Sequence, residues 1–155
     1  MPRTYTVSFE GVAVTAAQDF FEVQPADDKP CRITGIFLSQ SSDVGDAAEE
    51  LLRIEVIRGH TTSGSGGGTP VEEPLEPNDA AAGFVSETNN TTIASAGTTS
   101  ILHAQTFNIR SGLELFLPPG AQPKANQGNT TMVVRLMAAP TDSLTMSGTL
   151  YVEEE

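Results

Sequence analysis

Short segments in which apolar and polar residues alternate constrain this chain more than any other feature. At the N-terminus, Tyr5, Val7 and Phe9 fall on one face of an extended segment, whereas the residues between them are polar. Because successive side chains of a β-strand point to opposite faces, this pattern predicts a strand with one buried face. We expect further short strands at 12–15, 20–23, 31–40, 52–58, 91–96, 101–109, 113–117, 131–137 and 144–152.

Turn residues separate these segments. The separators include Gly97, Ser111-Gly112 and the run 118–120, Pro-Pro-Gly. An α/β fold needs long helical crossovers between its strands, and the sequence offers none. The pattern therefore predicts an all-β fold, either jelly-roll-like or an antiparallel β-sandwich, as a single domain spanning residues 1–155. We expect at most one short helix, at 42–52, where Ser42 or Asp43 offers an N-cap.

The segment 31–40 is the strongest predicted strand. Cys31, Ile33 and Phe37 fall on one face, and Ile36 and Leu38 fall on the other. We therefore expect both faces of this strand to be covered and the strand to be central in its sheet. The alternating segments predict a core that comprises Tyr5, Val7, Phe9, Ile33, Phe37, Ile54, Val56, Phe107, Ile109, Leu115, Leu136, Leu150 and Val152.

Residues 59–83 interrupt the series of strands with a run rich in Gly, Pro and acidic residues. Loops longer than about 12–15 residues without their own structure are uncommon in compact domains, so we treat this long loop as functional. Because glycine loses the most conformational freedom on ordering, we expect contacts with a neighbouring subunit to order the Gly-rich run 64–68. The alternative is an idle loop. If the loop serves assembly alone, replacing 63–76 by a short linker leaves the melting temperature of the subunit nearly unchanged.

The candidate interface residues lie in this long loop. Its prolines fix φ and lack an N–H, which excludes a central strand and favours an extended excursion over a partner surface. Its carboxylates are suited to basic groups on a partner, although an exposed ion pair contributes about 0–1 kcal/mol. The predicted interface residues are His60, Pro70, Glu72, Glu73, Pro74, Glu76, Pro77 and Asp79.

The charge of the chain argues against two classes of partner. A formal net charge of -12 opposes binding to nucleic acid and to anionic lipid, so we predict no nucleic-acid or membrane partner. No stretch approaches the roughly 18 apolar residues of a membrane span, and the first residues lack an apolar leader, so we expect synthesis in the cytoplasm. The single cysteine, Cys31, excludes an internal disulfide and is expected to be a buried apolar side chain.

Side chains that usually carry chemistry are sparse here. His60 and His103 lack the spacing of a metal motif, and no Gly-x-Ser-x-Gly elbow is present. We predict no catalytic, metal-binding or cofactor-binding residues, and no enzyme activity. An acidic turn at 43–50, with Asp43 and Asp46, leaves cation binding open but lacks the full calcium-loop pattern.

Three stretches carry a resemblance to a known group of proteins. They are PADDKPCRITGIFLSQSSDVGDAAEELLRIEVIRGHTTSG at 25–64, PNDAAAGF at 77–84 and MVVRLMAAPTDSLTMSGTLYVEE at 132–154. Together they resemble small virion structural proteins of tailed bacteriophages and prophages, most closely capsid decoration (cement) proteins. The resemblance spans most of the chain and is weakest at 64–76. It implies a β-rich homotrimer on the capsid exterior.

The predicted function combines this resemblance with the missing catalytic motifs. We expect a non-enzymatic bacteriophage virion structural protein, a decoration or cement subunit that binds the major capsid protein and stabilises the head. It would be made in the host cytoplasm and form a homo-oligomer, with a trimer favoured. The alternatives are a receptor- or carbohydrate-binding module of a phage fibre, a neck or tail-completion component and, weakest, an enzyme.

Overall fold

The computed structural model describes residues 1–42, 49–126 and 131–155, and these residues form β-strands without a helix. The predicted all-β class is therefore confirmed for the described residues. Of the short helix expected at 42–52, residues 43–48 lie outside the described residues, and β4 begins at Leu51. The strands are β1 (Arg3–Val14), β2 (Gln18–Gln24), β3 (Cys31–Gln40), β4 (Leu51–His60), β5 (Glu73–Pro74), β6 (Val85–Asn90), β7 (Ser100–Asn108), β8 (Leu113–Phe116), β9 (Lys124–Ala125), β10 (Thr131–Leu136) and β11 (Leu144–Glu154).

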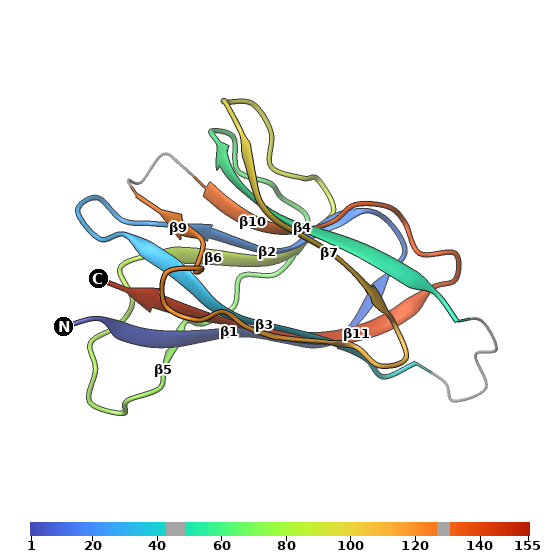
Figure 1. Ribbon diagram of the computed structural model, residues 1–155, viewed down its shortest axis with the longest axis horizontal. Coiled ribbons are helices and arrows are strands. Elements are labelled where there is room, and N and C mark those ends of the chain that lie inside the picture. Colours follow the sequence, from blue (N-terminus) through green and yellow to red (C-terminus); the bar gives the residue numbers. More distant parts are fainter. Residues whose placement is uncertain (43–48, 127–130) are drawn as a thin grey trace.

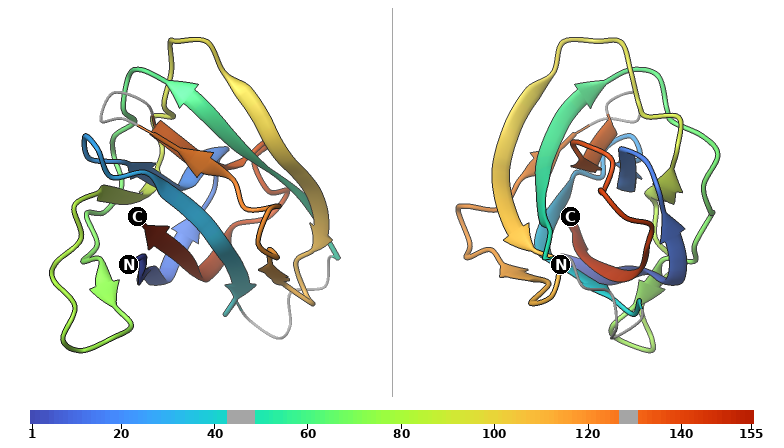
Figure 2. Two further views of the ribbon diagram at one scale, coloured as in Figure 1. Left: turned by 60° about the vertical axis from the view of Figure 1, so that its left-hand side comes forward. Right: turned by 90° about the vertical axis from the view of Figure 1, so that its right-hand side faces the viewer.

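Two antiparallel sheets face each other across the core (Figure 1). The first sheet has the order β5-β1-β11-β3-β8, with β9 paired to the start of β3. The second sheet has the order β6-β2-β10-β4-β7. Figure 2 shows the two sheets curving around a shared interior. This arrangement confirms the predicted antiparallel β-sandwich.

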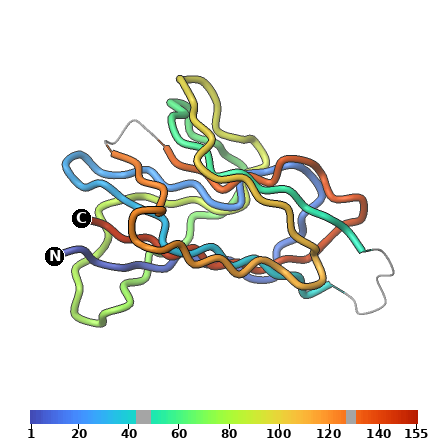
Figure 3. The backbone as a smooth tube through the Cα atoms, viewed as in Figure 1, coloured from blue at the N-terminus to red at the C-terminus, as the bar shows by residue number. Residues whose placement is uncertain are grey.

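The pairing pattern is that of a jelly roll. The first half of the chain pairs with the second half as in one long hairpin: β4 lies beside β7, β3 beside β8, β2 beside β10, and β1 beside β11. The hairpin is wound so that β1 and β3 lie in the first sheet and β2 and β4 lie in the second, which is how double-sheet jelly rolls close. The smooth backbone trace in Figure 3 shows the two chain ends lying side by side as a result.

The core lies between the inner faces of the two sheets. Eleven of the residues predicted for it are buried, from Tyr5 on β1 to Val152 on β11. Leu115 is partly buried and packs against the core. Large side chains contact one another here, among them Phe9, Phe20 and Phe21. Burying each such side chain contributes about 1.5–3 kcal/mol relative to exposing it.

Phe37 is the exception, and its prediction was wrong. Along β3, Ile33 pairs with Val152 and Gly35 pairs with Tyr151, so Thr34 is an extra residue with no residue opposite it in the β11 register. Such a β-bulge changes which side chains face inward beyond it. Ile36 and Leu38 therefore enter the core, and Phe37 lies half-buried on the outer face of the sheet.

Two predicted strand boundaries also differ from the structure. In the segment predicted at 12–15, residues 12–14 are the end of β1, which continues through a bulge between Phe9 and Val12 where Gly11 has a φ of 61°. The strand predicted at 91–96 lies earlier in the chain, at Val85–Asn90. Thr, Asn and Glu dominate β6, so no apolar alternation marked it in the sequence.

A matched pair of substitutions tests the faces of β3. Ile36→Thr should destabilise the fold by about 2–4 kcal/mol, because it removes buried apolar atoms and leaves a hydroxyl in the core. Phe37→Thr should cost clearly less, because the new side chain stays at the solvent side of the sheet. Urea denaturation measures both free energies of unfolding. An equal or larger loss for Phe37→Thr would contradict the bulge at Thr34.

Candidate functional site

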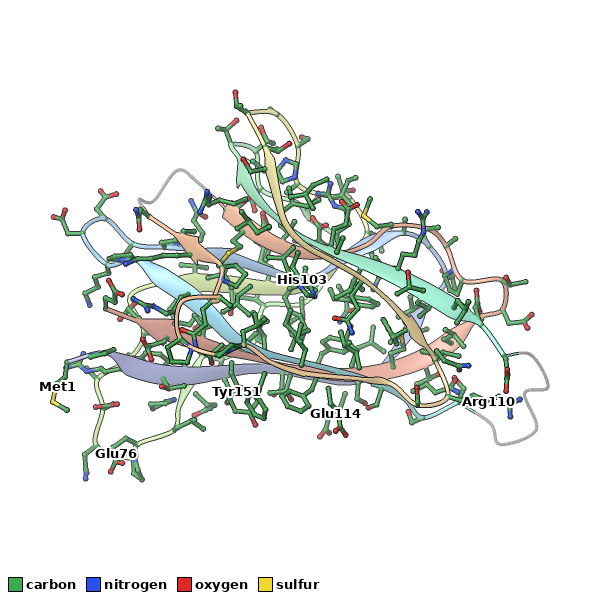
Figure 4. The ribbon with its side chains drawn as sticks, in the orientation of Figure 1. Met1, Glu76, His103, Arg110, Glu114 and Tyr151 are labelled. Atoms are coloured by element: carbon green, nitrogen blue, oxygen red, sulfur yellow. The ribbon has the colours of Figure 1, made fainter. Side chains whose placement is uncertain are left out.

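Three aromatic side chains meet on the outer face of the first sheet. The ring centroids of Phe37 and Phe116 lie 4.9 Å apart, those of Phe37 and Tyr151 lie 5.6 Å apart, and those of Phe116 and Tyr151 lie 5.7 Å apart. Phe116 is 68% exposed and the other two are half-buried. Figure 4 shows Tyr151 projecting away from the second sheet. We call these three residues the aromatic platform.

A glycine lets the rings of the aromatic platform close over the sheet. Gly35 lies between Phe116 on β8 and Tyr151 on β11 in the strand register. A Cβ atom at Gly35 would lie 3.0 Å from the Phe116 ring and 3.3 Å from the Tyr151 ring. Glycine inside a strand often marks such a close approach. The two rings therefore occupy the space above Gly35.

The sequence contains a signal for part of this platform, although we did not predict it. Phe116 and Tyr151 alternate with Leu115, Leu150 and Val152, so a strand that buries the aliphatic residues must turn the aromatic ones outward. Phe37 gave no such signal, because the bulge in β3 cannot be read from residue types.

Hydroxyl and carboxylate groups lie beside the platform at Phe37. The strand register places Ser8, Thr149, Phe37 and Glu114 in one row across β1, β11, β3 and β8. Figure 4 shows Glu114 on the same side of the sheet as Tyr151. A recess of about 250 Å³ lies along this row, and among its lining residues are Ser8, Glu10, Phe37, Ser39, Glu114, Ser147 and Thr149.

The chemistry of this recess favours neutral or basic groups. Its polar lining consists of hydroxyls and two carboxylates, and the side chains of Phe9 and Phe37 also line it. Carboxylates accept hydrogen bonds and attract cations, whereas the faces of aromatic rings attract cations and apolar groups. An anionic group would meet repulsion from Glu10 and Glu114. The face is suited to a partner that supplies apolar area and basic side chains, or to a neutral sugar.

The Gly-rich part of the long loop is paired within the chain. Beyond β4 and β7, backbone bridges join Thr62 to Ser95, Ser65 to Thr92 and Gly68 to Thr88, each with reciprocal N–H to carbonyl hydrogen bonds of 2.8–3.0 Å. Starting from the Arg58–Ser100 pair of β4 and β7, each bridge is shifted by at most one residue relative to the pair before it. We call this continuation the hairpin tip. Ordering the run 64–68 thus needs no neighbouring subunit, contrary to our expectation.

Glycines are required in the hairpin tip by close backbone approach. A Cβ atom at Gly67 would lie 2.0 Å from the carbonyl oxygen of Thr88, and one at Gly64 would lie 2.5 Å from that of Thr92. Real Cβ atoms do not come so close to a backbone oxygen. The glycine-rich composition therefore allows two backbone segments to pack tightly, and a linker in place of 63–76 should now lower the melting temperature.

A buried carboxylate anchors the hairpin tip to the second sheet. Glu22 of β2 is buried and accepts hydrogen bonds from the Ser63 hydroxyl at 3.0 Å, the Gly64 N–H at 3.3 Å and the Asn90 side-chain amide at 3.2 Å. Burial raises the pKa of Glu22, and the hydrogen bonds from Ser63 and Gly64 partly oppose that rise. Glu22 thereby fixes the path of the chain just after β4.

A buried ion pair fixes the other side of the hairpin tip. Asp19 is fully buried and accepts a 2.6 Å hydrogen bond from Arg135 Nε and a 2.8 Å hydrogen bond from the Ala94 N–H. Arg135 Nη2 also donates to the Ala94 carbonyl at 2.9 Å. Ala94 packs with Ile57 and Val133 in a small apolar cluster separate from the main core. A third layer thus covers part of the second sheet.

The eight predicted interface residues have different environments. His60 ends β4 and is buried. Glu72 is half-buried and accepts hydrogen bonds from the Ser86 N–H and hydroxyl at 2.8 and 2.5 Å. Asp79 forms an ion pair with Arg3 at 3.6 Å. The long loop therefore contacts its own domain at several points.

The remaining predicted interface residues lie nearer the surface. Glu73 and Pro74 form β5, which pairs with Tyr5 and Thr6 on β1. Pro70 is half-buried, whereas Glu76 and Pro77 are exposed, and Figure 4 shows Glu76 on a loop that projects beyond the first sheet. The role of these eight residues in assembly stays a prediction.

Other residues considered in the sequence have structural partners. Cys31 is buried, and burial together with the charge of Glu154 raises its pKa to about 12. His103 forms a 2.9 Å hydrogen bond with Gln105. Asp43 and Asp46 lie outside the described residues. Within 1–42, 49–126 and 131–155, no group of three His, Cys, Asp or Glu side chains is placed to hold a metal ion, and no helix is long and apolar enough to cross a membrane.

Comparisons with known proteins leave the chain without an assigned family. No family model and no curated protein matches it. Among solved structures, one of T=1 particles derived from infectious bursal virus is similar at 15% sequence identity, with a TM-score of 0.17. The match covers 98% of this chain and 40% of that chain, so this chain spans less than half the length of the viral protein. A likeness at this TM-score carries no argument about function.

The packing of the hairpin tip leads to a prediction about stability. Gly67→Ala should destabilise the fold by about 1–3 kcal/mol, because its Cβ would push 64–68 away from 88–92. Ser65→Ala is the control, because Ser65 is exposed and pairs through its backbone. Urea denaturation of both variants measures the effect. If Gly67→Ala unfolded like the control, the hairpin tip would not be packed as described.

His60 generates a prediction about pH. Burial and the nearby charge of Arg135 lower its pKa from the ordinary value of 6.5. Since the unfolded state then binds the proton more readily, stability should fall as pH drops below about 6.5 toward the folded-state pKa. His60→Gln should reduce the difference in unfolding free energy between about pH 7.5 and about pH 5.5. An unchanged difference in His60→Gln would show that this histidine does not cause the pH dependence.

Proposed function

We propose that this chain is a non-enzymatic structural protein of a bacteriophage virion, a decoration or cement subunit that binds the major capsid protein and stabilises the head. The aromatic platform is the observation that carries this proposal. Isolated apolar side chains on a surface need no explanation, but contiguous aromatic rings mark contact sites. Aromatic residues supply much of the binding energy at protein interfaces.

The surroundings of the platform support a protein partner. Hydroxyl and carboxylate groups border the platform at Phe37, as the polar rim borders the apolar centre of an interface. The net charge of -12 keeps the free subunit soluble and favours docking to a basic surface. The jelly-roll topology is common in viral capsid and lectin domains, although a fold alone does not assign a function.

The resemblance to decoration proteins is the source of the proposed oligomeric state, location and partner. The stretches at 25–64, 77–84 and 132–154 resemble decoration proteins, which implies a homo-oligomer, with a trimer favoured, on the capsid exterior. Synthesis in the host cytoplasm followed by addition to assembled heads fits an acidic, independently folded domain. The major capsid protein is the proposed partner.

A capsid-binding experiment tests the platform. Purified protein should bind saturably to expanded capsids that lack it, and Phe116→Ser should weaken binding about 30-fold or more, which corresponds to roughly 2 kcal/mol. Leu51→Ser is a matched control, because both side chains are 68% exposed and Leu51 lies on the other sheet. Failure of the parent to bind, or equal binding by Phe116→Ser and the parent, would reject the proposal.

A carbohydrate-binding module of a phage fibre is the second candidate. The hydroxyl-lined recess beside Phe37 favours it, since sugars stack on aromatic rings and exchange hydrogen bonds with hydroxyl and carboxylate groups. A clear preference on a glycan array, lost in Phe37→Thr, would favour this candidate. The copy number in purified virions separates a decoration subunit, which is abundant, from a neck or tail-completion component, which forms a single ring.

A further inference from the structure

Strand β7 is a long sheet edge without a covering strand. It pairs with β4 on one side, and within the described part of the chain no strand pairs with its other side. The other sheet edges are short, covered or interrupted: β8 has four residues, β6 is bridged by Gly68, and the edge of β1 is paired with the two residues of β5 and then broken by the bulge between Phe9 and Val12. β7 has nine residues. It is therefore the longest regular open edge among the described residues.

The usual protections of an open edge are missing from β7. Proteins block such edges with charged residues, proline or bulges, because unpaired backbone groups attract other strands. The run from Thr88 to Ile109 contains no Asp, Glu, Lys, Arg or Pro. A register shift occurs opposite Val56 and Ile57, but His103–Asn108 pairs regularly with Leu51–Val56. These six residues form a regular, uncharged edge.

The hydrogen-bond pattern identifies which backbone groups point outward. Ile109 donates its N–H to the Glu50 carbonyl. Because every second residue of an antiparallel strand bonds to the same neighbouring strand, Phe107 and Gln105, two and four residues earlier, also bond to β4. The Arg53 carbonyl, opposite Thr106, instead accepts from Met137 on the other side of β4. The N–H and C=O groups of Thr106 and Ala104 therefore point away from β4, toward the open edge. Both residues are exposed.

The charge of the chain favours a second copy of this chain as the partner that pairs with the open edge of β7. Two chains with a net charge of -12 repel each other, so they can approach most closely where both are locally uncharged. An uncharged edge strand meets this requirement, and an antiparallel edge pairs with itself around a twofold axis. The pairing would extend the second sheet from one subunit into the next.

We propose that β7 is a homodimer interface in which two copies pair antiparallel around Gln105. In this register, Ala104 of one copy and Thr106 of the other exchange their outward backbone hydrogen bonds, and the two Gln105 residues lie opposite each other. The C=O of Asn108 already accepts hydrogen bonds from Ser111 and Gly112. This disfavours any register in which the Asn108 carbonyl would have to accept a hydrogen bond from the second copy. The proposal does not depend on the capsid partner, and it gives a dimer in place of the trimer implied by the resemblance.

Oligomeric state in the absence of capsids tests the interface. Sedimentation analysis should show a dimer for the parent and a monomer for Thr106→Pro, which lacks the outward N–H but breaks no hydrogen bond to β4. Thr106→Val keeps the N–H and should remain dimeric, and the melting temperature of each variant reports its folding. A parent that is monomeric or trimeric, or a folded Thr106→Pro that stays dimeric, would overturn the proposal.

A cysteine cross-link tests the register even if the proline variant fails to fold. Opposite residues in a non-hydrogen-bonded antiparallel pair have Cα atoms about 4.5 Å apart, which is within the range of a disulfide. Gln105→Cys should form a disulfide-linked dimer on mild oxidation, whereas Thr15→Cys, on an exposed connection, should not. Native Cys31 is buried and does not interfere. Equal cross-linking of the two variants would exclude pairing at Gln105, and pairing of β7 with a different protein would leave both variants monomeric.

Discussion

Antiparallel pairing between the two halves of the chain is the constraint on which the rest of the structure depends. β1 to β4 each lie beside a strand from the second half, so every main strand of the sandwich obtains its partner from a distant part of the sequence. Since strands in a sheet satisfy their backbone groups only through such partners, no strand here is stable alone. The faces of the domain follow from the register of these pairs, and one extra residue at Thr34 is enough to move Phe37 from the core to the surface.

The hairpin tip shows how polar groups stabilise a region that lacks a large apolar core. Beneath it lie Glu22 and Asp19, two carboxylates that would be costly to bury without partners. Asp19 is compensated by the charge of Arg135, whereas Glu22 is satisfied by neutral donors from Ser63, Gly64 and Asn90. The acidic composition of the chain is thus partly structural, because these carboxylates hold backbone segments rather than face solvent.

The sequence predicted the fold class and most of the core because both depend on apolar alternation. Tyr5, Val7, Leu150 and Val152 alternate without interruption, and their strands have the predicted inner faces. Prediction failed where register or close approach decides the outcome. The bulge in β3 leaves no trace in residue type, and the glycines of 64–68 read as flexible although contact with Thr88 and Thr92 requires them. The aromatic platform was half visible, through Phe116 and Tyr151.

The pairing of β1 with β11 has a consequence for the order of events during synthesis. Arg3 lies opposite Glu154, so β1 is synthesised well before β11, the strand that pairs along most of its length. Contacts between such distant residues are slow to form, since a long chain segment must close before they contribute. The first sheet can therefore form only after β11 has been synthesised, and a nascent chain that carries β1 to β4 exposes unpaired strand edges until then.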